Sequence, residues 1–273
     1  AGIDGLDQIA ALNWVDQTPL AGSKRSNPVT YVKAYEHIRK LLASTREAKA
    51  LGLTPRVFSF NVEGGRCPVC QGTGRQVIDM HFMADVEVIC DACDGRRFQS
   101  RVLQLQWRGK NIDDILGMTV DEATAFFKGE TKVVRALAPL REVGLGYVRL
   151  GQSATTLSGG EAQRLKLAVH LATMRDGSGQ LFVFDEPTTG LHPADLKKLL
   201  DIFQSMVRRG CSLLIIEHNL DVIAAADWVL DLGPEGGDLG GEIVVQGPLK
   251  KIMACEASLT GRYLRERFAP ATR

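Results

Sequence analysis

Two short motifs constrain the fold of this 273-residue chain more than any other feature. The first, LSGGE at 157–161, places a serine and two glycines before a helical pattern over 159–174. Bare backbone amides and the positive end of a helix dipole at such a point can face a phosphate group. The second, LFVFDE at 181–186, is a buried-strand pattern that ends in two adjacent carboxylates. We therefore expect Ser158, Gly159, Gly160 and Gln163 to contact a bound phosphate.

Apolar periodicity predicts an α/β fold. The expected strands are 10–16, 180–185, 212–216, 228–232 and 242–246, with a hairpin within 76–89. The expected helices are 31–42, two within 119–143 starting at Thr119, 159–174, 193–208, 219–225 and a basic helix near the end that contains Arg262, Arg265 and Arg267. Because strands and helices alternate after residue 176 and the strands are almost continuously apolar, we expect a buried, mostly parallel sheet.

Four residues at predicted strand ends are candidates, three of them for catalysis and Asp185 for cofactor binding. Asp185 and Glu186 end a strand at the edge where parallel sheets place ligands. Asp185 can hold Mg²⁺ through water, and Glu186 can orient and deprotonate an attacking water molecule. His218 follows strand 212–216 closely and can hydrogen-bond a transferring phosphate, although a single histidine is more often structural. Gln17, after the first strand, could contact the metal ion or the attacking water, or be a surface glutamine.

Four of the six cysteines form two C-x2-C pairs, Cys67 with Cys70 and Cys90 with Cys93. Paired cysteines without a secretory signal favour a closed structural Zn²⁺ site over disulfides, with a redox role as the weaker alternative. The glycines around them permit turns that aim backbone amides at the sulfurs. Met80, Phe82 and Met83, near the tip of the predicted hairpin, are either apolar filler or a wedge for distorted nucleic acid.

Charge is uneven along a chain whose formal net charge is +1. Residues 21–60 contain eight Lys or Arg, including Lys24 and Arg25, against two acidic residues. This excess of positive charge is typical of a surface that binds a polyanion, and a solvated helix face explains it equally well. Lys24 and Arg25 could contact DNA or a protein partner. No apolar run approaches the about 18 residues of a membrane span, and no signal-peptide pattern is present, which predicts a cytoplasmic protein without membrane contact.

A G-x-x-x-x-G-K-[ST] phosphate loop is absent from the 273 residues. The first residue is Ala1, and the chain opens within a pattern, which we interpret as a truncation or an excised segment. The amino end of the helix at Ser158 is therefore expected to act together with a phosphate loop that is not part of this chain. Head-to-tail pairs of nucleotide-binding domains have this arrangement. We expect the isolated chain to bind ATP weakly and not to hydrolyse it.

The motifs and their order resemble the C-terminal ABC-type nucleotide-binding domain of the UvrA family of excinuclease ABC proteins over nearly the whole chain. The residues that carry the resemblance are DQ-x-P at 16–19, RSNP-x-TY at 25–31, FSFN at 58–61, GGRC at 64–67, GQSATTLSGGE at 151–161, DEPTTGLH at 185–192, EHNLDVI at 217–223 and DLGPEGG at 231–237.

The resemblance implies recognition of damaged double-stranded DNA in bacterial nucleotide excision repair, ATP hydrolysis, structural zinc, a homodimer and delivery of a UvrB partner. It assigns Gln17 to the Q-loop, 158–163 to the signature, Asp185 and Glu186 to the Walker B acids, His218 to the switch histidine and the four paired cysteines to zinc. It also implies four segments: 1–62, a partial ATPase lobe with the Q-loop and the start of the signature subdomain; 63–100, a zinc module with a β-hairpin; 101–175, a helical signature subdomain; and 176–273, an ATPase lobe. The family has two tandem ATPase halves and a partner-binding insertion, and this chain corresponds to part of one half.

Two other functions stay open. UvrA-like proteins that shed DNA-intercalating drugs share these motifs, and sensitivity of a deletion strain to ultraviolet light or to an intercalator separates the two. The cysteine pairs, each followed by a glycine two residues later, also resemble the zinc repeats of DnaJ chaperones, which bind polypeptides. That family has more such repeats and no ATPase signature.

Overall fold

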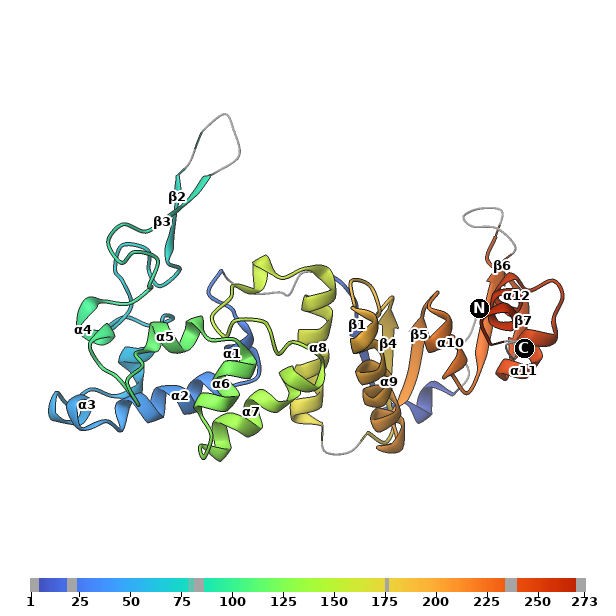
Figure 1. Cartoon of the computed structure of the whole chain (residues 1–273), viewed down its shortest axis with the longest axis horizontal. Helices are drawn as coiled ribbons and strands as arrows, with labels where there is room; N and C mark the ends of the chain where they lie inside the picture. Colours follow the sequence, from blue (N-terminus) through green and yellow to red (C-terminus); the bar gives the residue numbers. More distant parts are fainter. Residues whose placement is uncertain are drawn as a thin grey trace, which may run out of the picture. The chain divides into compact units, whose positions relative to one another are not determined.

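The computed structural model describes residues 5–18, 24–78, 80, 86–174, 177–233 and 240–268 (Figure 1). The chain forms two compact units. Unit 1 comprises Ala1–Asp16 and Ser178–Arg273, and unit 2 comprises Gln17–Gly177. This division follows packing, and it joins the expected segments 63–100 and 101–175 in one unit. The functional roles expected for the four segments remain predictions.

Unit 1 is built around a three-stranded parallel sheet with the strand order β1-β4-β5. Its elements are η1 (Leu6–Gln8), β1 (Ala11–Val15), β4 (Gln180–Asp185), α9 (Pro193–Arg208), β5 (Ser212–Ile216), α10 (Leu220–Ala224), β6 (Val229–Gly233), β7 (Glu242–Gly247), α11 (Leu249–Ala254) and α12 (Leu259–Phe268). The α/β class and the parallel pairing of β1, β4 and β5 are confirmed.

One face of this sheet is covered, and the other is exposed. Phe184 of β4 packs against Phe203 of α9, with ring centroids 4.9 Å apart. The opposite face presents Trp14 and Leu214, both 55% exposed, at register positions on either side of Val183. Side chains alternate between the two faces of a strand, so an apolar run need not be buried on both sides. Within unit 1, the sheet that was expected to be buried is therefore covered on one face.

The strand expected at 228–232 does not extend the parallel sheet. As β6, it pairs with β7 in antiparallel fashion, with an irregular register between Asp231 and Leu232. The hydroxyls of Ser258 and Thr260 donate hydrogen bonds of 2.6 and 2.7 Å to the Asp231 carboxylate. These bonds attach the start of α12 to β6. The alternation of strands and helices in the sequence does not show whether β6 pairs with β7 or forms a fourth strand of the parallel sheet.

Unit 2 is helical and carries the cysteine pairs and a hairpin. Its elements are α1 (Pro28–Tyr31), α2 (Ala34–Ala43), α3 (Arg46–Ala50), η2 (Pro55–Phe58), β2 (Arg75–Ile78), β3 (Val86–Ile89), α4 (Ser100–Leu103), α5 (Ile112–Gly117), α6 (Val120–Phe126), α7 (Thr131–Glu142), η3 (Ala154–Thr156) and α8 (Gly159–Thr173). Strands β2 and β3 pair antiparallel, which confirms the expected hairpin.

A local signal marks the start of α6, but none marks the start of α2. Thr119 caps α6 and forms a reciprocal capping box with Glu122, as its position predicted. The helix expected over 31–42 begins only at Ala34, because Lys33 adopts a left-handed conformation with φ of 60°. Its inner face buries Tyr35, whose hydroxyl donates a 2.6 Å hydrogen bond to the carbonyl oxygen of Phe58. This bond fixes the segment that leads into the cysteine pairs.

No helix among the described residues has both the length and the apolar character that crossing a bilayer requires.

Candidate nucleotide and zinc sites

The amino end of α8 is an exposed helix mouth shaped by a capping box. Ser158 is the N-cap residue, and its side-chain oxygen accepts a hydrogen bond from the backbone N–H of Glu161 at 3.3 Å. In return, the Ser158 N–H donates to Glu161 Oε2 at 2.8 Å. The serine hydroxyl and the carboxylate of Glu161 thus already accept hydrogen bonds from two of the backbone N–H groups at this helix end. The remaining amides and the helix dipole still favour a negative group there.

Two residues outside the motif hold Glu161 in place. The Tyr147 hydroxyl donates a 2.8 Å hydrogen bond to Glu161 Oε1, and Arg164 Nη2 donates to the Tyr147 oxygen at 3.4 Å. Burial by itself would raise the pKa of Glu161, but hydrogen bonds from Ser158 and Tyr147 lower this pKa below its ordinary value of 4.5. Burial, and then the neighbouring Glu161, raise the pKa of Tyr147. Tyr147 lies ten residues before the motif and had no sequence signal of its own.

The structure brings Gln17 next to the signature. A Cβ built on Gly159 would lie 3.3 Å from both Cβ and Oε1 of Gln17, so the absence of a side chain at Gly159 permits this approach. Gly160 is buried, and Gln163 is only 2% exposed. A phosphate at the helix mouth would meet Ser158 and Gly159 first. Gln163 is almost fully buried, and its phosphate contact remains a prediction.

In unit 1, the predicted acids lie at the carboxyl end of β4. Asp185 is the last residue of the strand and pairs with Ile216 of β5. Glu186 is exposed and has a left-handed backbone with φ of 44°, which is uncommon for a residue with a Cβ and is concentrated at functional sites. His218 Nδ1 lies 3.9 Å from Glu186 Oε1. The structure therefore brings Glu186 and His218 together at one sheet edge.

Glu217 fixes the two loops at this edge. Its Oε1 accepts a 2.8 Å hydrogen bond from the N–H of Thr188, and its Oε2 accepts bonds of 3.0 and 3.1 Å from the N–H groups of His218 and Asn219. Glu217 was part of the family motif but had no predicted role. The sequence signal that could have identified Glu217 is its position between the end of β5 and Asn219, the N-cap residue of α10.

The predicted nucleotide residues are thus divided between the units. Ser158, Gly159 and Gln17 belong to unit 2, while Asp185, Glu186 and His218 belong to unit 1. Each group is internally assembled, and each lies at an element end suited to its predicted chemistry. Their roles remain predictions.

Cys67, Cys70, Cys90 and Cys93 form a buried cluster in unit 2. Their four sulfurs all lie within 4.8 Å of one another, and Cys70 Sγ is 3.7 Å from Cys93 Sγ. Four sulfurs bound tetrahedrally to Zn²⁺ at about 2.3 Å are separated by about 3.8 Å. The cluster therefore fits a four-thiolate zinc ion, with no ligand position left for chemistry at the metal.

Backbone turns at the cysteine pairs donate to the sulfurs, as the glycines predicted. The Gly74 N–H donates to Cys70 Sγ at 3.3 Å. Burial would raise the pKa of Cys70, but hydrogen bonds from Gly74 and Gly72 lower it, whereas burial raises the pKa of Cys93 to about 12. Zn²⁺ binds thiolates, so binding at this cluster would release protons and would depend on pH.

Of the predicted apolar residues at the hairpin tip, Met80 is exposed, and Phe82 and Met83 lie outside the described residues. Whether they are filler or a wedge is therefore untested.

No family model matches the chain. Three similar curated proteins have the name UvrABC system protein A. The chain is 50% identical over 264 residues to the protein of Aquifex aeolicus (strain VF5), 49% to that of Escherichia coli (strain K12) and 50% to that of Staphylococcus aureus (strain COL). These alignments cover 96–97% of the chain and 28% of each relative. The chain therefore spans less than a third of the length of the relatives it matches.

A similar solved structure is UvrA2 from Deinococcus radiodurans, with a TM-score of 0.88 and 48% sequence identity. The match covers 96% of this chain and 32% of that chain. Sequence and fold thus agree along almost the whole chain.

Proposed function

We propose that this chain, a UvrA homologue over 264 of its residues, contributes to the ATPase that recognises damaged double-stranded DNA in bacterial nucleotide excision repair. Because the chain spans 28% of its UvrA relatives, ATP hydrolysis, DNA recognition, dimerisation and delivery of UvrB are proposed for the whole protein. The observation that carries the proposal is the sheet edge at which Glu186 and His218 meet, with Asp185 beside them.

Each side chain at this edge has a distinct proposed role. Glu186 orients and deprotonates the attacking water, and His218 donates a hydrogen bond to the transferring phosphate. Asp185 would hold Mg²⁺ through water, which would supply charge neutralisation at the phosphates. Glu217 acts through the others, because its three backbone hydrogen bonds set the positions of the loops that carry Glu186 and His218.

The helix mouth of unit 2 supplies the second group of proposed contacts. Ser158 and Gly159 would face the phosphates of ATP held by a phosphate loop on the second ATPase half, since no such loop occurs in the 273 residues. Gln17, next to Gly159, is proposed to contact the metal ion or the attacking water. The zinc ion would be structural, because the four cysteines fill a tetrahedral site.

Substitution of the proposed catalytic base tests the ATPase. In the whole protein, Glu186→Gln should lower ATP turnover by about 10²–10⁴-fold while ATP binding is retained. Glu256→Gln, at an exposed glutamate of the same unit, is the matched control and should leave turnover unchanged. Unchanged turnover in Glu186→Gln would refute the assignment, and ATP hydrolysis by the 273-residue chain alone would refute the need for a phosphate loop from elsewhere.

A binding comparison tests the DNA function against polypeptide binding. The chain should bind duplex DNA in a salt-dependent manner, since basic residues contact phosphates, and the whole protein should prefer a duplex with a bulky adduct. Preferential binding of an unfolded polypeptide would contradict the proposal and support the DnaJ-like alternative.

A further inference from the structure

The base of the hairpin forms an open pocket of about 460 Å³ beside the cysteine cluster. Its lining includes the cationic side chains of Lys24, Arg25 and Arg75 and the polar side chains of Gln71 and Thr73. Within the described part of the chain, no carboxylate lines it. Three cations around a pocket that is open to solvent suit an anion with several oxygen acceptors, such as a phosphate.

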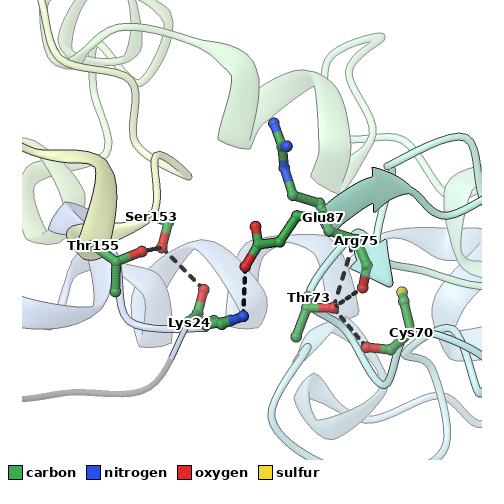
Figure 2. Close-up of polar contacts among 7 residues, drawn as sticks. All are labelled: Lys24, Cys70, Thr73, Arg75, Glu87, Ser153 and Thr155. Carbon is green, nitrogen blue, oxygen red and sulfur yellow. Dashed lines mark hydrogen bonds and ion pairs between the residues drawn. The ribbon is translucent and has the colours of Figure 1, made fainter. Parts of the chain in front are cut away.

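The anion that the structure places next to this pocket is the chain's own Glu87. Lys24 Nζ lies 2.5 Å from Glu87 Oε1 on strand β3 (Figure 2). The hydrogen bond and charge of Lys24, and to a lesser extent the charge of Arg75, lower the pKa of Glu87. Both partners are substantially exposed, at 55% and 40% of their side chains, so a competing anion can reach the pair. An exposed pair of this kind is weak and salt-sensitive.

Lys24 also connects the pocket to the loop before α8. Its carbonyl oxygen accepts a 3.2 Å hydrogen bond from the Ser153 hydroxyl, which lies 2.9 Å from the hydroxyl oxygen of Thr155 (Figure 2). The N–H of Ala154 donates to the carbonyl oxygen of Ser26 at 2.8 Å. Lys24 therefore has its side chain on the hairpin and its backbone on the loop that leads to Ser158.

We propose that this pocket binds a backbone phosphate of nucleic acid, and that Glu87 is an internal competitor which the phosphate displaces from Lys24. The inference rests on the proposed DNA function and adds its regulation. While Lys24 pairs with Glu87, the hairpin is attached to the loop before α8. When the phosphate takes the ammonium group of Lys24, strand β3 is released and Lys24 keeps its backbone bond to Ser153. Phosphate binding thereby breaks the Lys24–Glu87 connection between the hairpin and the loop before α8.

A double-mutant cycle tests the competition. Duplex DNA binding to the zinc-loaded chain is measured by fluorescence anisotropy over a range of salt concentrations for wild type, Glu87→Gln, Lys24→Gln and the double variant. Glu87→Gln should bind about five-fold more tightly at low salt, the scale of two unit charges about 4 Å apart in water. Lys24→Gln should bind more weakly, and Glu87→Gln should have no effect in that background. Glu63→Gln, which removes one charge from a surface pair with Arg66 in the same unit, is the matched control and should match wild type.

The outcomes separate this inference from the proposed function. If wild type binds the duplex and Glu87→Gln binds no more tightly, the internal competition is refuted and the DNA function stands. If the gain from Glu87→Gln persists without Lys24, the pair is not the competing contact and the inference is also refuted. If no variant binds the duplex, the proposed DNA function fails as well. Inorganic phosphate should weaken duplex binding no more than chloride at equal ionic strength; tight, Glu87-sensitive binding of inorganic phosphate alone would overturn the assignment to nucleic acid.

Discussion

Replacing Glu217 with alanine should release the two loops at the acidic sheet edge. In the native structure, this carboxylate accepts hydrogen bonds from the backbone N–H groups of Thr188, His218 and Asn219 at 2.8, 3.0 and 3.1 Å. Only the bond from Thr188 crosses between the loops, whereas the other two close the turn into α10. Alanine removes both acceptor oxygens and with them all three hydrogen bonds, whereas glutamine leaves one neutral side-chain oxygen.

The expected cost follows from these three bonds. A hydrogen bond to a charged group contributes about 1.5–3 kcal/mol, and an exposed N–H that water can reach loses less. We count the bond from the half-buried Thr188 fully and the two turn bonds at about 0.5 kcal/mol each, which gives about 3 kcal/mol for Glu217→Ala. Glu217→Gln should cost about 1 kcal/mol, because the amide oxygen can still accept from Thr188.

Amide hydrogen exchange is the appropriate assay, because a chain of two units need not unfold in one step. The amide of Thr188 should exchange up to about 150-fold faster in Glu217→Ala, as about 3 kcal/mol requires, and the amides of His218 and Asn219 should also exchange faster. Glu256→Ala, at an exposed site in the same unit, should change them little. Exchange rates in Glu217→Ala that match those of wild type would refute the view that this carboxylate holds the loops.

Three further predictions concern unit 2. Removing zinc with a chelator, or replacing Cys93 with serine, should abolish stoichiometric zinc and disorder the cysteine module; a purified chain with no zinc and no response to the chelator would contradict this. Because the pKa of Glu161 is lowered in the folded chain, the stability it contributes is present above pH 4.5 and is lost as the pH falls through the lowered value. Glu161→Gln should therefore flatten the acid side of the stability–pH curve, and an unchanged curve would show that the carboxylate contributes nothing. Gly65→Ala should destabilise unit 2 by about 3 kcal/mol or more in denaturant titration, since its Cβ would lie 1.7 Å from the carbonyl oxygen of Val57; a stable alanine variant would refute the close approach.

The sequence was sufficient to predict the structure where a local residue pattern is compatible with only one type of element. The bounds of β4, α9 and β5 agree with the expected ones, because short apolar runs alternate with a long amphipathic pattern that begins at Pro193. The helix start at Thr119 and the cysteine cluster were equally local, since each depends on residues a few positions apart or on metal-ligand spacing.

Features decided by tertiary packing could not be predicted. The left-handed turn at Lys33 interrupts a helical pattern that contains no Gly or Pro, so the sequence has no local signal for the start of α2. Gln163 closely follows the glycines in sequence, but this spacing did not predict that its side chain is buried. Tyr147 and Glu217 act through contacts across the fold or between loops, which a linear motif does not display.

The left-handed backbone at Glu186 has an evolutionary consequence. A residue with a Cβ adopts such a conformation at a cost of about 1–3 kcal/mol, which glycine avoids and asparagine reduces. Directed evolution for heat resistance alone should therefore enrich glycine or asparagine at this codon, whereas selection for turnover should keep the acid. The two selections should therefore yield variants that differ at position 186. At this residue, thermal stability and catalytic activity favour different side chains.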